Sequence, residues 1–201
     1  MAEFNVLGVT RHQLLVHPQV PYTSHNSSAA ICLEPSGSTD LTVLFERVKK
    51  MMVDDFQPGS DPGLCIAAEN PPAEIINFGR LAQNYVVTQA EARRLAADHG
   101  MILEGLGGSQ DGVIGALAAV GLAACGEDGR YLLVGRSREL SGLQSVLSVL
   151  NAGIEAVCTL DGQKVQQGMV LSDKLRPARR GGRAVQVVGW VEDHWEPLKL
   201  N

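Results

Sequence analysis

The sequence has few aromatic residues and no long apolar run. Aromatic residues make up only 4% of the 201-residue chain and hydrophobic residues 45%, so the core must consist of leucine, valine, alanine and isoleucine. The longest uncharged apolar run, residues 112–126, is too short and too rich in glycine to span a bilayer. The start of the chain lacks the basic and apolar segments of a secretory signal, so we expect a cytoplasmic protein.

Cysteine motifs and excess positive charge are also missing. The cysteines are widely spaced, without a C-x-x-C pair, which excludes a small disulfide scaffold and is poor zinc-ligand geometry; they are Cys32, Cys65, Cys125 and Cys158. We expect buried free thiols in a reducing compartment, and we predict no metal site and no cofactor. The net charge of -5 argues against a general polyanion binder, although a local basic patch remains compatible with it.

The order of the predicted elements indicates an α+β protein with helices on one face of a mainly antiparallel sheet. We expect one domain or two tightly packed subdomains: an α+β part over residues 1–136, and a helix with a β-rich tail over residues 137–201. Helices are predicted over residues 40–54, 73–84, 89–99, 113–125 and 140–151. Residues 4–9 and 13–16 are predicted to form a short hairpin or one bent strand. Further strands are predicted over residues 29–33, 63–68, 101–104, 130–134, 154–160, 165–170, 183–191 and 194–198.

Three local signals sharpen this prediction. Thr39 or Asp40 is expected to cap the first helix, and Thr88 with Glu91 forms a capping-box pattern at the start of another. The strand over residues 63–68 is apolar throughout, which is typical of a central strand. Exposed apolar residues over 140–151 make a homodimer an expected arrangement; they are Leu143, Val146, Leu147 and Leu150.

A glycine-rich segment over residues 104–112 precedes the most apolar predicted helix. Asp111 is a plausible N-cap of that helix, and the uncharged run after it predicts a helix covered on most sides. Its N-terminus offers free N–H groups and partial positive charge, which favours a ligand site in the loop. The segment departs from the phosphate loop, because Val113 and Ile114 follow Gly112 where that motif has lysine and then serine or threonine. It also departs from the G-x-G-x-x-G dinucleotide fingerprint, because Gln110 stands at the position of the third glycine. A tight loop before a close-packed core helix explains the same pattern without a ligand.

Carboxylates supply the second candidate feature. Glu104 and Asp111 flank the glycine-rich loop and could form a pair that binds an amine or a guanidinium through charge-assisted hydrogen bonds. Other carboxylates around a predicted loop and strand end could hold a cation, although such groups are more often solvated; they are Asp54, Asp55, Asp61 and Glu69. The polar loop over residues 17–28 could line a pocket, and its composition is equally that of a surface loop.

One dense basic run supports a different hypothesis, an RNA-associated module. Five cations surround Gly181 and Gly182 and could contact phosphates; they are Lys174, Arg176, Arg179, Arg180 and Arg183. A solvated hairpin loop accounts for the same run. A stand-alone enzyme is a third alternative, but no nucleophile elbow, Ser-His-Asp order or catalytic cysteine signature specifies a reaction.

Several segments, taken in order, resemble one enzyme family. They are residues 16–23 followed by Asn26, Asp61-Pro62-Gly63, residues 88–92 with His99-Gly100, and the stretch from Asp111 to Gly121. Over roughly residues 15–135 the chain is similar to the ferredoxin-like central domain of the archaeal tRNA agmatinylcytidine synthetases, which join agmatine to a cytidine of an isoleucine tRNA with ATP. The chain lacks the aspartate-rich motif of their kinase-like domain and their zinc ribbon, and has little room for their nucleic-acid-binding barrel.

The resemblance implies a ferredoxin-like α/β sandwich and a pocket for an amine or guanidine metabolite, but not ATP use or tRNA modification. The pocket is expected between the loop of Tyr22 and Asn26 and the start of the apolar helix. Amides of residues 107–112 would anchor an anionic part of the ligand. The predicted ligand-binding residues are Tyr22, Asn26, Glu104, Gly107, Gly108, Asp111, Gly112 and Gly115.

Overall fold

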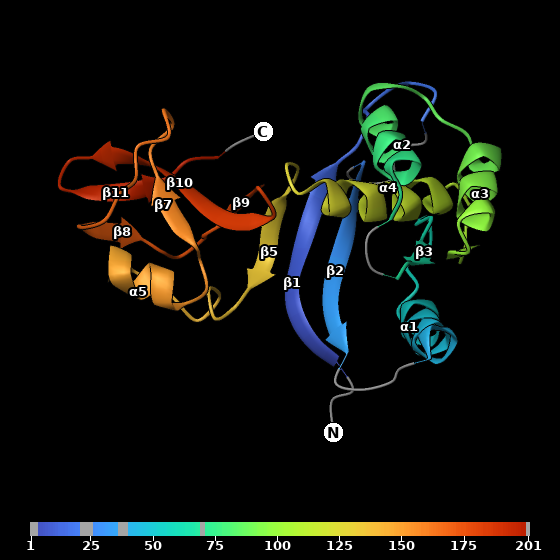
Figure 1. Ribbon diagram of the computed structural model, residues 1–201, viewed down its shortest axis with the longest axis horizontal. Helices are drawn as coiled ribbons and strands as arrows, with labels where there is room; N and C mark the ends of the chain where they lie inside the picture. Colours follow the sequence, from blue (N-terminus) through green and yellow to red (C-terminus); the bar gives the residue numbers. More distant parts are fainter. Residues whose placement is uncertain (1–3, 21–25, 36–39, 69–70, 200–201) are drawn as a thin grey trace. The chain divides into compact units, whose positions relative to one another are not determined.

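A computed structural model describes residues 4–20, 26–35, 40–68 and 71–199. In these ranges the chain forms five helices, a large mixed sheet that is mostly antiparallel, and a separate two-stranded hairpin (Figure 1). The α+β class and the mainly antiparallel sheet predicted from the sequence are therefore confirmed. None of the helices in the described part has the length and apolar composition that a membrane crossing requires.

The chain divides into two compact units. The first comprises Met1–Asn5, His12–Ala30 and Glu34–Cys125, and the second Val6–Arg11, Ile31–Leu33 and Gly126–Asn201. The middle residues of strands β1 (Phe4–Gln13) and β2 (Ser27–Pro35) therefore belong to the second unit, and the ends of both strands belong to the first. Of the two predictions for residues 4–9 and 13–16, a short hairpin or one bent strand, the structure favours the second, because β1 is a single strand with a register shift between Val9 and Thr10.

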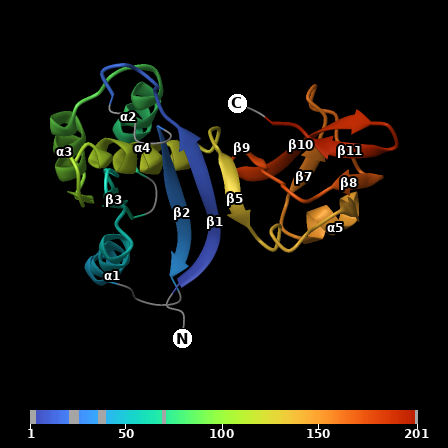
Figure 2. The ribbon, with the colours of Figure 1, turned by 180° about the vertical axis from the view of Figure 1, so that it is seen from behind.

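Helix α4 (Gly112–Cys125) forms the centre of the first unit. Figures 1 and 2 show α2 (Ala73–Asn84) crossing α4, and α3 (Gln89–Asp98) near the start of α4. Val113, Leu117 and Leu122 of α4 have no exposed surface, and the first two belong to a buried core with residues of α2 and α3. The expected internal, apolar helix is confirmed.

The remaining elements of this unit are α1 (Leu41–Asp54), β3 (Gly63–Ile66) and β4 (Ile102–Gly105). Asp40 caps α1, since its Oδ1 accepts from the backbone N–H of Thr42 at 2.8 Å, and Thr39 lies outside the described residues. Thr88 caps α3 by accepting from the N–H of Glu91 at 3.2 Å, as the capping-box pattern predicted.

The prediction of a central strand over residues 63–68 is wrong. Within the described part of the chain, β3 pairs only with β4, in register from Gly63 opposite Gly105 to Ile66 opposite Ile102. The apolar character of β3 has another cause, because Cys65 packs against the buried core that includes α4. A helix, rather than neighbouring strands, covers this segment.

The second unit is a sheet with one short helix. Its strands are β5 (Arg130–Val134), β6 (Leu143–Ser145), β7 (Ala156–Cys158), β8 (Met169–Leu171), β9 (Ala178–Arg180), β10 (Arg183–Val191) and β11 (His194–Pro197). The pairing order is β2-β1-β5-β9-β10-β11-β8-β6, and β7 pairs with β10 in parallel. Helix α5 (Val146–Asn151) packs into a core that includes Val149, Val170 and Val188.

The helix predicted over residues 140–151 is too long. Residues Leu143–Ser145 form β6, because they pair with β8, and α5 begins only after Ser145, whose side chain accepts from the N–H of Ser148. The expected exposed stripe is therefore incomplete: Val146 is 1% exposed, whereas Leu143 and Leu147 are 48% and 64% exposed. The four cysteines are free, as predicted, although each is partly rather than fully buried.

Candidate functional site

A cavity of about 490 Å³ lies within the first unit. Four parts of the described chain line it: residues 14–20 after β1 with residues 26–27 at the start of β2, the loop of residues 56–61 before β3, the end of α2 with residues 85–87, and the glycine-rich loop that leads into α4. Its volume is within the range of small-molecule pockets.

The glycine-rich loop is a tight turn at the end of β4. The N–H of Leu106 donates to the carbonyl of Pro62 at 2.8 Å, and the N–H of Gln110 donates to the carbonyl of Gly107 at 3.1 Å. Gly108 and Gln110 have φ values of 59° and 67°, a conformation that glycine adopts freely and that is uncommon for glutamine. Arg93 of α3 donates to the side-chain oxygen of Gln110 at 2.9 Å, which helps to hold this turn.

Asp61 occupies the N-terminus of α4. Its Oδ2 accepts from the N–H of Asp111 at 3.1 Å, and its Oδ1 accepts from the N–H of Gly112 at 3.4 Å. The helix dipole and the unpaired first-turn amides favour a carboxylate in this position. The chain approaches so closely here that a Cβ on Gly112 would lie 2.2 Å from the carbonyl oxygen of Asp61.

The side chain of Asp111 does not cap the helix, contrary to the sequence prediction. Its Oδ1 accepts from Nε2 of Gln89 at 2.7 Å, and the same amide donates to the carbonyl of Ser109 at 2.9 Å. The start of α3 therefore orients Asp111, and Asp61 performs the capping that we had assigned to Asp111.

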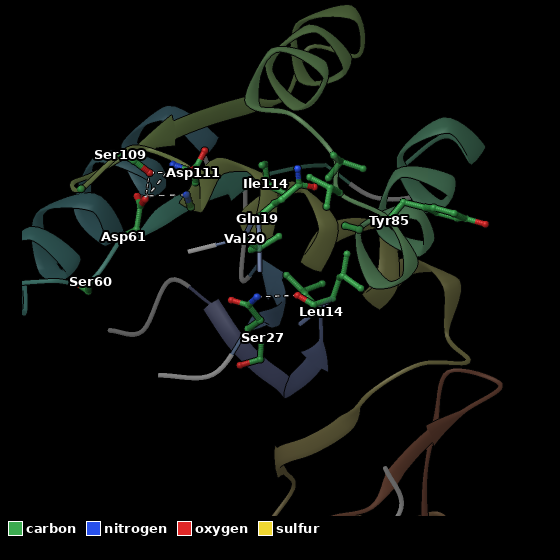
Figure 3. Close-up of a pocket in the computed structure, with 18 of the residues that line it drawn as sticks. Leu14, Gln19, Val20, Ser27, Ser60, Asp61, Tyr85, Ser109, Asp111 and Ile114 are labelled. Carbon is green, nitrogen blue, oxygen red and sulfur yellow. Dashed lines mark hydrogen bonds between the residues drawn. The ribbon is translucent and has the colours of Figure 1, made fainter. Parts of the chain in front are cut away.

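A single hydroxyl bridges the two carboxylates. Oγ of Ser109 lies 2.6 Å from Oδ2 of Asp61 and 2.7 Å from Oδ2 of Asp111 (Figure 3). A hydroxyl carries one proton and can donate it to only one acceptor at a time. One carboxylate oxygen therefore faces the hydroxyl oxygen without a proton between them, and two negative groups lie close together.

Away from this acidic group, Leu14, Val20 and Ile114 give the cavity an apolar wall, next to the polar side chains of Gln19 and Ser27. Figure 3 shows Asp61, Ser109 and Asp111 on one side, and Leu14 and Tyr85 on the other. Tyr85 is 65% exposed. The cavity thus combines an acidic end with an apolar wall.

Asn26 holds one wall of the cavity in place. Its side-chain Nδ2 donates to the carbonyl of Leu15 at 2.7 Å, and its carbonyl accepts from the N–H of Leu14 at 2.8 Å. The N–H of Leu15 donates in turn to the carbonyl of Ala82 on α2. These bonds fix the segment after β1 against the end of α2.

The structure brings together five of the predicted ligand-binding residues. Those that line the cavity are Asn26, Gly108, Asp111, Gly112 and Gly115. Tyr22 lies outside the described residues. Gly107 does not line the cavity; it packs against the ring of Phe56, where a Cβ would lie 2.5 Å from a ring carbon.

Glu104 is not part of the cavity. Nζ of Lys49 on α1 lies 2.7 Å from Oε1 and 2.8 Å from Oε2 of Glu104. This hydrogen bond is the main cause that raises the pKa of Lys49 above its usual value. Glu104 therefore has an intramolecular cation, and the second carboxylate of the cavity is Asp61.

Sequence reasoning did not identify Ser109 and Gln89, and it listed Asp61 only among carboxylates of uncertain role. The proline and glycine after Asp61 indicated the entry to a strand, but no local signal places that residue at a helix start 50 residues later. These partners belong to different elements, so only the tertiary structure brings them together.

Three arginines of the basic run over residues 174–183 contact other groups of the second unit. Arg179 donates to Oη of Tyr131 at 2.8 Å, with its guanidinium 5.8 Å from the centre of that ring. Arg180 donates to the carbonyl of Glu127, and Arg183 lies 3.5 Å from a carboxylate oxygen of Glu155. Several of these cations are thus used within the second unit.

No group of three or more His, Cys, Asp or Glu side chains in the described ranges could hold a metal ion. Neither the protein-family models nor the curated proteins that were compared with the chain give a match.

Proposed function

We propose that the first unit binds a small amine or guanidine metabolite in the cavity beside α4. The hydroxyl of Ser109, shared between Asp61 and Asp111, is the observation on which the proposal rests. A cationic N–H group at this place would donate to the carboxylate oxygen that the hydroxyl cannot serve. Hydrogen bonds between ionised partners are shorter and stronger than neutral ones.

The charge of the cavity supports a cationic ligand. Asp61 and Asp111 line it, whereas no lysine or arginine occurs among its described lining residues. Two neighbouring carboxylates without a positive partner repel each other, and a bound cation would relieve that repulsion. The apolar wall on the other side suits the carbon chain of an alkylamine or alkylguanidine.

The proposal omits the anionic ligand group that the sequence had suggested. The amides of Asp111 and Gly112 already donate to Asp61, and the amide of Gln110 donates within the loop. A ligand phosphate or carboxylate would compete with Asp61 for the start of α4. A positively charged ligand does not face this competition.

The resemblance to the tRNA agmatinylcytidine synthetases is compatible with this ligand class. Their agmatine carries a guanidinium on a carbon chain, which corresponds to the acidic end and the apolar wall of the cavity. A ferredoxin-like arrangement, implied by the same resemblance, remains part of this proposal.

Calorimetric titration tests the proposal with three probes: agmatine, n-butylamine and neutral n-butanol. We expect the two cations to bind and the alcohol not to bind. Asp111→Asn keeps the size of the side chain and removes its charge, so it should weaken binding of the cations about tenfold or more, as expected for loss of a hydrogen bond to a charged group. Asp98→Asn, an exposed residue of α3 that pairs with Arg94, is the matched control. Equal binding to both variants, or no binding of any cation to the folded protein, contradicts the proposal.

A further inference from the structure

Three arginines from separate parts of the second unit gather beside β5. Arg130 begins β5 and lies opposite Ala178 of β9 in the sheet. Arg176 precedes Pro177, whose carbonyl accepts from the N–H of Tyr131 at 2.7 Å. Arg138 reaches back to β5, because its Nε donates to the carbonyl of Leu132. The strand therefore collects cations that the sequence separates by up to 46 positions.

These three guanidinium groups have no acidic partner in the described part of the chain. Among residues 4–20, 26–35, 40–68 and 71–199, no carboxylate forms a salt bridge with any of them, and side-chain N–H groups of Arg138 and Arg176 donate to backbone carbonyls. Nearby carboxylates have other partners: Glu127 accepts from the N–H of Gly181, and Glu155 from that of Ala184.

The cluster carries an electrostatic cost. Partial burial, followed by the charges of Arg138 and Arg130, lowers the pKa of Arg176. In the strand pairing, Arg11 of β1 stands opposite Arg130. Like charges placed side by side destabilise a fold, and a bound anion removes this penalty.

We propose that Arg130, Arg138 and Arg176 form a binding site for a phosphate group. Phosphate offers more oxygens and more negative charge than a carboxylate, and the planar guanidinium matches its geometry through paired hydrogen bonds. Arg130 and Arg138 are exposed, so a ligand can reach them from solvent. The site lies in the second unit and is independent of the amine cavity.

The phosphate could belong to a free phosphate ester or to the backbone of a nucleic acid, and two probes separate these sources. Equilibrium dialysis measures binding of labelled inorganic phosphate, and fluorescence anisotropy measures binding of a short single-stranded RNA at several salt concentrations. Each is applied to the full chain and to R130Q/R138Q, whose exposed positions should leave the fold intact. The matched control is K50Q/R94Q, which removes two exposed charges that pair with Asp54 and Asp98 in the first unit.

We expect R130Q/R138Q to weaken binding of at least one probe about tenfold or more, while the control binds as the unaltered chain does. Loss confined to inorganic phosphate identifies a free phosphate ester as the ligand. Weaker RNA binding identifies a nucleic-acid backbone, provided that the slope of log affinity against log salt concentration also falls by about 2, one for each arginine removed. Equal binding of both probes to the two variants, or no binding of either probe to the unaltered chain, overturns the proposal.

Discussion

Two glycines of α4 have opposite surroundings, and replacing each by alanine should change stability in opposite directions. A Cβ on Gly115 would meet Cδ1 of Leu14 at 3.6 Å and Cβ of Ser28 at 3.8 Å, which are ordinary contacts. A Cβ on Gly121 would lie 2.1 Å from the carbonyl oxygen of Ile75 on α2, closer than any real contact. The two substitutions add the same methyl group to the same helix.

The magnitudes follow from helix propensity and packing. Alanine is about 1 kcal/mol more favourable than glycine inside a helix, and this gain applies at both positions. At Gly121 the backbone of α2 must also move away by about 1 Å, and such overpacking costs about 1–3 kcal/mol or more. We therefore expect Gly115→Ala to raise the free energy of unfolding by up to about 1 kcal/mol and Gly121→Ala to lower it by up to about 2 kcal/mol.

Urea unfolding followed by circular dichroism measures both changes. For a chain of this length the melting temperature should shift by about 2–4 °C per kcal/mol, so thermal unfolding provides an independent check. A Gly121→Ala variant as stable as Gly115→Ala would refute the close packing of α2 on α4. Because Gly115 lines the cavity, its methyl should also narrow the site without unfolding the unit.

Further predictions concern single groups elsewhere. Tyr131→Phe should lower the free energy of unfolding by about 1–3 kcal/mol, because it removes the hydroxyl that accepts from Arg179; unchanged stability in urea would contradict this. Burial raises the pKa of Cys65 to about 12, so mass spectrometry after brief treatment with iodoacetamide at about pH 8 should find Cys125 modified before Cys65, and the reverse order would be inconsistent with that burial. The hydrogen bond to Asp193 and the charges of neighbouring carboxylates raise the pKa of His194 above its usual value of about 6.5. Protonated His194 therefore stabilises the folded protein at lower pH, and this contribution is lost as the pH rises through the pKa of His194 in the folded state. Unfolding at about pH 5.5 and 8 should therefore show a larger difference between the unaltered chain and His194→Gln at the lower pH, and a difference independent of pH would contradict the ion pairs.

Sequence reasoning succeeded where a local signal determines the element. Helix α2 spans residues 73–84, as predicted, because Pro71 and Pro72 precede an uninterrupted helical pattern. Thr88 and Asp40 cap the helices to which they were assigned. In each case the residues that define the element lie within a few positions of one another.

It failed where partners distant in the sequence decide the outcome. Residues 143–145 carry an apolar pattern compatible with a helix, but pairing with β8 makes them a strand. The apolar β3 is covered by a helix, so its composition did not identify a central strand.

The candidate site illustrates the same limit. Asp111 was expected to cap α4 by its own side chain, yet Asp61 accepts the first amides and Gln89 binds Asp111. The glycine-rich loop and the acidic character of the site were visible in the sequence, whereas the identity of the second carboxylate was not. Glu104 had the right charge and a suitable place in the chain, but Lys49 of α1 pairs with it.

A crystal structure determined from crystals grown with agmatine at saturating concentration tests the central proposal most directly. We expect the guanidinium to lie within about 3 Å of carboxylate oxygens of Asp61 and Asp111, with the carbon chain directed toward Leu14. Agmatine bound against other residues, or only water in the cavity at saturating ligand, would contradict it.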